Sequence, residues 1–218
     1  METHITKTIN SNIYIRLGLI NDFNVRKSPE ILSILSNVLE KSIHTNEKLL
    51  KRSRKKDIVT IFHGTRAPTL SIRRYIDRVF EYSRCSPSCL VVAYVYLDWF
   101  IQQTSSYVTS LNVHRLLVTC VLVAVKFLED EHYDNSYFAK IGGISRAEMN
   151  NLEMKLLSTL NYKLHVSIDT FNQYCMHLEK EGASSSTRHK WSIRNYGLKG
   201  GSWLHKDGSG RHRKCDRH

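Results

Sequence analysis

Two long apolar stretches in the middle of the chain constrain the fold more than any other feature of the sequence. The first, CLVVAYVYLDWFIQQ, covers residues 89–103, and the second, NVHRLLVTCVLVAVKFLED, covers residues 112–130. Both are rich in Val and Tyr, which favour strands, but both are longer than ordinary strands. Their length therefore predicts two helices. Because apolar residues occupy nearly every face, both helices should lie buried at the centre of the domain.

Shorter helices are predicted around this central pair. A serine followed by a proline, as at Ser28–Pro29 and Ser86–Pro87, is typical of a helix start, and Ser145 with Glu148 forms a capping box. The remaining predicted helices start near Thr69 and cover residues 137–141 and 169–180. The sequence thus predicts an all-α fold, a compact bundle in which amphipathic helices surround two apolar ones.

The chain of 218 residues is long enough for one domain with a sizeable core. Changes in periodicity and composition divide the chain into four predicted parts. The predicted parts are a flexible N-terminal arm over 1–27, an N-terminal helix with a basic linker over 28–61, the folded domain over 62–181, and a disordered basic tail over 182–218.

The net charge of +12 is unevenly distributed. The segment 182–218 holds nine Lys or Arg against two Asp, and KRSRKK at 51–56 forms a second basic run. Such runs are found in nuclear import signals and nucleic-acid patches, and equally in solvated loops. A nucleic-acid reader carries a basic stripe on its folded domain, so we expect nucleic acid to be an unlikely partner. We expect the protein in the nucleus, the cytoplasm or both.

Several classes of protein are disfavoured by the sequence. An odd number of cysteines, five, fits a reducing compartment better than secretion, and no apolar run approaches the roughly 20 residues that span a bilayer. No phosphate-binding loop, nucleophile elbow or HExxH motif occurs. Cys85 and Cys89 are interpreted as a packed structural pair rather than a zinc site. We therefore predict no catalytic residue, metal, cofactor, small-molecule substrate or membrane partner.

Three charged residues lie inside apolar stretches. Asp98 closes the run VVAYVYLD, where a buried carboxylate needs a partner or strong hydrogen bonds. Lys126 ends the second apolar run, and Glu153 lies on the same helical row as Leu157. Lys126 could extend to solvent along its aliphatic stem, with Glu153 bordering a half-buried stripe. Alternatively, both charges lie at the rim of an apolar surface that binds a partner protein.

A set of short motifs makes the second interpretation more specific. They are FHG at 62–64, YIDRVFEYSRCSPSCLVVAYVYLD at 75–98, NVHRLL and AVKFLED within 112–130, YFAKIGGIS, EMNNLE and LL within 137–157, and L, V, TF and YC within 164–175. In this order and spacing the segment from Phe62 to about Leu178 resembles the cyclin box of plant P-type (U-type) cyclins, relatives of the fungal phosphate-signalling cyclins. The resemblance covers just over half of the chain.

The resemblance implies a single five-helix cyclin box without catalytic activity. Such a protein binds and activates a cyclin-dependent serine/threonine protein kinase, in cell-cycle or phosphate- and nutrient-linked control. In the family a Lys and a Glu grip the kinase backbone near its mobile regulatory helix, and these positions match Lys126 and Glu153. The family's apolar kinase contacts match Leu157 and Tyr162. Its structural Arg–Asp ion pair matches Arg73 and Asp98, so the resemblance implies six site residues in all.

The sequence also departs from the family pattern. Trp99 stands where the family usually has Arg in a YLDRF motif, so an ion pair is missing there. Residues 71–76 resemble the substrate-docking patch of the mitotic cyclins only loosely, so we do not predict that function. The leading hypothesis is a kinase-regulating cyclin. The alternative is a basic, transcription-associated protein of cyclin fold that binds nucleic acid.

Overall fold

The computed structural model describes residues 12–20, 28–53, 57–131 and 133–183. Every regular element in these ranges is a helix, which confirms the predicted all-α class. A short helix covers residues 12–17. The longer helices are α2 (Glu30–Ser53), α3 (Ile72–Ser83), α4 (Pro87–Thr104), α5 (Val113–Leu128), α6 (Asn135–Gly142), α7 (Arg146–Thr159) and α8 (Ile168–Ala183).

The two apolar stretches form α4 and α5, which pack along each other at the centre of the molecule. In α4 every residue from Cys89 to Asp98 is buried, and in α5 every residue from Leu116 to Val125 is buried. Burial on all faces requires neighbours on all sides. The amphipathic helices supply them, so the prediction from length and composition is confirmed.

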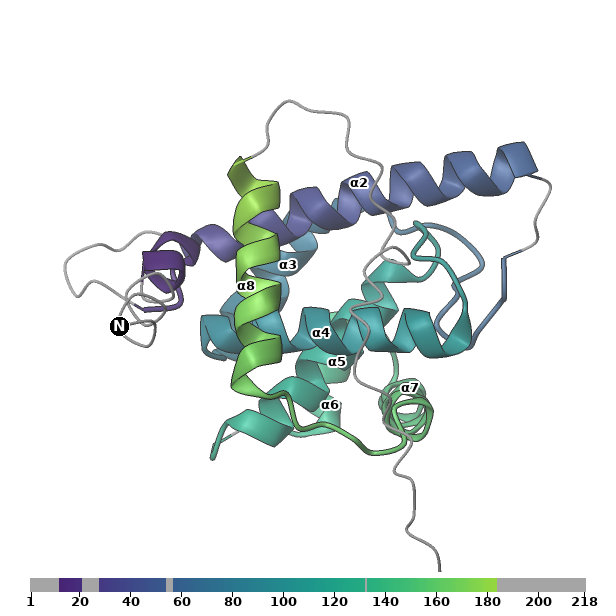
Figure 1. Cartoon of the computed structure of the whole chain (residues 1–218). Helices are drawn as coiled ribbons and strands as arrows, with labels where there is room; N and C mark the ends of the chain where they lie inside the picture. The colour runs from purple at the N-terminus through teal and green to yellow at the C-terminus, as the bar shows by residue number, and fades with distance from the viewer. Residues whose placement is uncertain (1–11, 21–27, 54–56, 132, 184–218) are drawn as a thin grey trace, which may run out of the picture.

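The outer helices cover the central pair in two groups. α2 packs against α3 and α8, while α6 and α7 pack against α5 and against each other. Figure 1 shows α8 lying across both α2 and α4. Helices α3 to α7 form a five-helix bundle, and α2 and α8 are added to its outside. This arrangement leaves the last turn of α5 beside α7.

The predicted helix starts are confirmed in part. Ser86 is the N-cap of α4 and Pro87 is its first residue, but the Ser86 side chain makes no capping hydrogen bond. Ser145 accepts a hydrogen bond from the backbone N–H of Glu148, as in a capping box. The Glu148 carboxylate does not return the bond, because it pairs with Arg115 of α5 at 2.6 Å. The helix expected near Thr69 begins later, at Ile72, because Ser71 is the residue that caps it. Side-chain capping therefore decides the boundary.

The prediction of a flexible N-terminal arm is wrong for residues 12–20. The short helix buries Ile13 and Leu17 in the main core. Its Tyr14 hydroxyl donates a hydrogen bond to Asn172 of α8, and its Arg16 forms an ion pair with Glu179 at 2.5 Å. Periodicity missed this helix because its aliphatic residues Ile13, Ile15 and Leu17 alternate at every second position, which is not a helical spacing, in a segment of only six residues. Residues 1–11 and 21–27 of the arm lie outside the described residues.

Gly18 allows this segment to approach α2. Its φ of +71° is a left-handed conformation, and a Cβ at this position would lie 3.1 Å from the Cα of Pro29. The N–H of Gly18 bonds to the carbonyl of Ile15, and that of Leu19 bonds to the carbonyl of Tyr14. Glycine is therefore the residue that can end this helix and turn the chain past the start of α2.

The predicted boundary between domain and tail at residue 182 also needs correction. Helix α8 continues to Ala183, and Gly182 lies so close to α2 that a Cβ would meet the Ile34 side chain at 2.7 Å. The glycine that marked a composition change in the sequence is thus a packing residue between α8 and α2. The rest of the predicted tail, residues 184–218, lies outside the described residues.

The FHG motif holds the segment before α3 in place. The backbone N–H of Thr60 donates to His63 Nδ1 at 3.0 Å, so the ring proton is on Nε2, which lies 3.1 Å from Asp57 Oδ2. The other oxygen of Asp57 accepts from the backbone N–H of Tyr107 at 3.2 Å. Phe62 is fully buried. The motif is therefore structural and ties residues 57–63 to the loop before α5.

The packing of the short helix predicts the effect of shortening Leu17. This side chain has no solvent exposure, so Leu17→Ala should lower the free energy of unfolding by about 2–5 kcal/mol. Ile15 in the same helix is 57% exposed, and Ile15→Ala should change it by less than about 0.5 kcal/mol. Urea denaturation followed by circular dichroism measures both. Equal effects of the two substitutions would show that the segment does not pack as described.

Candidate functional site: a charged pair at the end of the central helix

Lys126 and Glu153 come together in the folded protein. Lys126 lies in the last turn of α5 and Glu153 lies in the middle of α7, and the Lys126 Nζ donates to Glu153 Oε1 at 2.7 Å. The side chains are 31% and 13% exposed, so the pair lies at the surface without being fully solvated. Two residues that the sequence singled out separately thus form one site.

A third residue holds Glu153 in place. Asn135, the first residue of α6, donates through Nδ2 to Glu153 Oε2 at 2.6 Å and to Asn150 Oδ1 at 2.8 Å. Each oxygen of the Glu153 carboxylate therefore has a donor, one from α5 and one from α6. Sequence reasoning missed Asn135 because a polar residue at the start of a short helix carries no signal of a distant partner.

Several apolar residues lie close to the charged pair along the chain. Of the two predicted apolar contacts, Leu157 is half-buried against the core and Tyr162 is 60% exposed. Three exposed residues that the sequence analysis did not name lie next to the pair in the chain. They are Phe127 and Leu128 after Lys126, and Met154 after Glu153. Exposed large apolar side chains near a polar pair are typical of a surface that binds another protein.

A strained turn places Tyr162 at this surface. Asn161 and Tyr162 both have positive φ, 52° and 58°, and two such residues in a row are unfavourable for side chains other than glycine. The N–H of Tyr162 bonds to the carbonyl of Leu157 at 2.9 Å, which closes the end of α7. The turn therefore returns the chain beside Leu157 and fixes where the Tyr162 ring emerges.

The predicted ion pair between Arg73 and Asp98 is wrong. Arg73 instead pairs with Asp77 one turn along α3, at 3.0 Å. Asp98 is only 3% exposed and accepts hydrogen bonds from the Tyr174 hydroxyl at 2.5 Å and the Gln102 amide at 2.7 Å. Arg73 lies in a half-exposed pair. The two donors to the buried Asp98 carboxyl, from α8 and from its own helix, are neutral groups, and both bond to Oδ2.

Burial controls the protonation of Asp98. Removal from water raises the pKa of this carboxyl to about 7, although the hydrogen bonds from Tyr174 and Gln102 act to lower it. Its Oδ1 has no hydrogen-bond partner among the described residues. A carboxyl in an apolar site without a cation is more stable in its neutral form. Asp98 therefore joins α4 to α8 as a group that titrates near neutral pH.

Trp99 belongs to the same contact between α4 and α8. Its ring lies 6.0 Å from that of Tyr96. Burial and then the Asp98 carboxyl raise the pKa of Tyr174, and a hydrogen bond with Trp99 opposes this rise. The indole that replaces the family's usual Arg is therefore half-buried against α8 and supports a contact built from aromatic and neutral polar groups.

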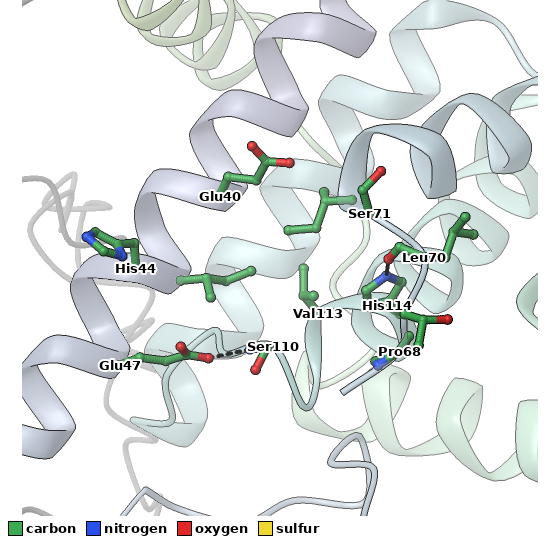
Figure 2. A pocket seen from close by; sticks show the side chains of 12 residues that line it. Glu40, His44, Glu47, Pro68, Leu70, Ser71, Ser110, Val113 and His114 are labelled. Atoms are coloured by element: carbon green, nitrogen blue, oxygen red, sulfur yellow. Dashed lines mark hydrogen bonds between the residues drawn. The ribbon is translucent and has the colours of Figure 1, made fainter. Parts of the chain in front are cut away.

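A cavity of about 320 Å³ lies at the other end of α5, between α2 and the start of α3 (Figure 2). Figure 2 shows Glu40, His44 and Glu47 of α2 along one side. Glu47 already accepts a hydrogen bond from the backbone N–H of Ser110 at 3.0 Å. His114 donates through Nε2 to the Leu70 carbonyl, and burial lowers its pKa, so it stays neutral. The other ring nitrogen of His114, Nδ1, is buried without a hydrogen-bond partner among the described residues.

The described residues contain neither a cluster of metal ligands nor a membrane-spanning helix. In the four described ranges, no group of three metal-ligating side chains comes together, and no helix there is long and apolar enough to cross a bilayer. Cys85 and Cys89 are both buried free thiols, as expected for a packed pair. His212, Cys215 and His218 of the predicted tail are spaced like metal ligands in the sequence, but we expect no metal site there, and they lie outside the described residues.

Comparison with known proteins identifies the class to which this helical bundle belongs. The family model of the cyclins matches residues 27–164, and the chain belongs to the cyclin family. It is 48% identical over 171 residues to rice Cyclin-P3-1, covering 77% of this chain and 72% of that protein. It is 46% identical over 176 residues to Cyclin-U3-1 of Arabidopsis thaliana, covering 79% of each chain. Arabidopsis Cyclin-U1-1 is 47% identical over 156 residues, which cover 71% of this chain and 74% of that protein.

The raised pKa of Asp98 predicts how stability depends on pH. An unfolded Asp titrates near pH 3.9, whereas Asp98 in the folded protein titrates near 7. Between these values the folded state binds more protons, so this group destabilises the fold as the pH rises, by up to about 4 kcal/mol. Asp98→Asn should remove this contribution. Urea denaturation from about pH 4 to pH 8 should show the variant gaining stability relative to wild type as pH rises; parallel curves would contradict the assignment.

Proposed function

We propose that this cyclin is a non-catalytic regulatory subunit that binds and activates a cyclin-dependent protein kinase through the surface around Lys126 and Glu153. The observation that carries the proposal is the pair itself. Two charges from α5 and α7 meet at 2.7 Å, half-buried among exposed apolar side chains. Membership in the cyclin family supports the kinase as the kind of partner.

The chemistry of the pair suits a segment of partner backbone. An ammonium group has three N–H donors, and within the described residues Lys126 uses one of them on Glu153. A carboxylate has about four acceptor positions, and Glu153 uses one on each oxygen. Lys126 can therefore donate to the partner's carbonyls while Glu153 accepts from its N–H groups. Both kinds of bond are charge-assisted and stronger than neutral ones.

Activation would follow from selective binding of one kinase conformation. The apolar residues around the pair fit a partner segment only when that segment has the right shape, and the central helices hold the surface rigid. A ligand shifts a conformational equilibrium by its difference in affinity for the two states. The cyclin thus needs no reacting group of its own. The kinase, its substrates and the process controlled, whether cell cycle or nutrient response, stay predictions, as does location in the nucleus or cytoplasm.

Removing one member of the charged pair should weaken kinase binding strongly. For Lys126→Ala and for Glu153→Ala we expect a loss of about 2–5 kcal/mol in binding free energy, or roughly 30-fold to several thousand-fold in affinity. Lys155, exposed on the same helix α7, provides the control, and Lys155→Ala should bind as wild type. The measurement is titration calorimetry with purified cyclin-dependent kinases, after circular dichroism confirms folding.

Two results would count against this proposal. If wild-type protein binds none of a representative set of cyclin-dependent kinases, the regulatory function is not supported. If it binds but neither alanine variant loses affinity, the kinase contacts a different surface.

Asn135 should contribute to the same binding by orienting Glu153. Loss of one hydrogen bond to a charged group costs about 1.5–3 kcal/mol, so Asn135→Ala should reduce kinase affinity by roughly 10- to 150-fold. Asn151, exposed on α7, is the control, and Asn151→Ala should have no effect. In a Glu153→Ala background the Asn135 substitution should add little, because its partner is absent. A full, additive effect there would show that Asn135 acts by another route.

A further inference from the structure

The cavity between α2 and the start of α3 has two unlike sides. Glu40 and Glu47 of α2 line one side, and Figure 2 shows both side chains extending away from that helix. Leu70, Ile72 and Val113 line the opposite side, where α3 and α5 begin. Such a site fits a peptide segment that carries cations along one edge and apolar side chains along the other.

The charge of this cavity is opposite to that of the chain as a whole. The chain has a net charge of +12, yet two Glu and no Lys or Arg line the cavity. Within the described part of the chain the Glu40 carboxylate forms no ion pair, and Glu47 uses one oxygen on the backbone N–H of Ser110. Both carboxylates therefore keep acceptor positions for a cation.

The spacing of the two carboxylates also bears on what they bind. Glu40 and Glu47 are separated by two turns of α2, or about 10 Å along the helix axis. Two cations on one extended segment suit this spacing better than a single ion does. The occupant should therefore be a stretch of polypeptide with two basic residues a few positions apart.

The chain itself contains a segment with this pattern. RHKWSIR at residues 188–194 has no acidic residue, and it alternates basic or polar with apolar side chains. In an extended chain, alternate side chains point to opposite sides. Lys190 and Arg194 then share one edge, about 13 Å apart, and Trp191 and Ile193 share the other. The basic edge matches the carboxylates of α2, and the apolar edge matches the opposite side of the cavity.

This segment begins close to α2. Gly182 lies against Ile34 of α2, and α8 ends at Ala183. Along the axis of α2, Glu40 is about 9 Å and Glu47 about 20 Å from Ile34. Because α8 and the cavity lie on different sides of α2, crossing the helix adds about 10 Å to each path. The distances to be covered are therefore about 19 Å and about 30 Å.

The residues between α8 and the segment are enough to cover these distances. An extended chain advances about 3.3 Å per residue. Lys190 can therefore lie up to about 23 Å from the end of α8, and Arg194 up to about 36 Å. Both reach the cavity in the same order as the carboxylates, with Lys190 at the nearer Glu40 and Arg194 at the farther Glu47.

We propose that residues 188–194 of this chain dock in the cavity between α2 and the start of α3. Lys190 pairs with Glu40 and Arg194 with Glu47, while the two apolar side chains between them pack against the opposite side. A segment joined to its own binding site acts at an effective concentration in the millimolar range, so a contact of modest intrinsic affinity is enough. The docked segment keeps the cavity closed to basic segments of other proteins.

This contact is independent of the proposed kinase surface. The cavity lies where α5 begins, and Lys126 lies in the last turn of the same helix. A kinase bound at Lys126 leaves the cavity accessible to the segment. The docking proposal therefore stands or fails without reference to kinase binding.

Carbodiimide cross-linking of the full-length protein tests the contact, because this reagent joins a carboxylate to a lysine amine where the two touch. Mass spectrometry should find Lys190 joined to Glu40 or Glu47. Glu30 is the control, because it is exposed on α2 and closer to Ile34 than either carboxylate of the cavity. Undirected collisions would favour Glu30, whereas docking should favour the cavity carboxylates by at least about 10-fold through the raised effective concentration.

Substitutions in the segment separate docking from charge attraction alone. The double variant Trp191→Ala and Ile193→Ala keeps Lys190 and alters no described helix. Loss of two apolar contacts should lower the yield of the cavity cross-links by about 10-fold or more. The matched control is Trp203→Ala with Leu204→Ala, another apolar pair outside the described residues. This control should cross-link as wild type.

A mixture of isotope-labelled and unlabelled protein decides which chain supplies the segment. Links within one chain support the proposal. Links only between labelled and unlabelled copies show that a second copy fills the cavity, and they overturn it. Lys126 and Glu153, 2.7 Å apart, should cross-link in every sample and report that the reagent has worked. The proposal is also overturned if Lys190 prefers Glu30, if it joins no carboxylate of α2 while this reference pair reacts, or if the double variant of the segment cross-links as wild type.

Discussion

The contact between α4 and α5 is the constraint on which the rest of the structure depends. Both helices are buried on nearly every face, so neither can exist without the other or without outer helices. Their burial sets the position of both ends of α5. One end lies beside the cavity near α2, and the other presents Lys126 to Glu153. The surface proposed to bind the kinase is thus an extension of the core, because the packing of α5 positions Lys126.

The sequence predicted this centre well because length and composition are local properties. It also predicted which charges are unusual, and the resemblance to P-type cyclins suggested the role that is proposed for Lys126 and Glu153. It could not predict the partner of Asp98. Tyr174 lies on α8, 76 positions away, and its approach depends on how α8 crosses α4. Asn135 was missed for the same reason, since only folding brings the start of α6 beside α7.

The errors at the two ends of the domain have a common physical origin. The short helix of residues 12–17 and the end of α8 contribute few apolar residues each, so neither shows a periodic stripe. They are held instead by pairwise contacts with each other and with α2, such as the ion pair between Arg16 and Glu179. Glycines at 18 and 182 allow close approach at these places. In a sequence, a glycine that starts a run of small and charged residues indicates a loop, which is why the predicted tail began at residue 182; the predicted N-terminal arm ran past Gly18 to residue 27.

The internal pairing of Lys126 and Glu153 explains how a binding surface can carry charges at the rim of a core. An unpaired charge that is 13% exposed, as for Glu153, would destabilise the free protein. The ion pair and the Asn135 amide remove that cost before any partner arrives. Because the side chains are already ordered, binding loses less conformational entropy than it would with flexible ones. In the proposed complex the partner's backbone would add hydrogen bonds to groups that keep their existing ones, so stability of the free cyclin and affinity for its partner would not oppose each other.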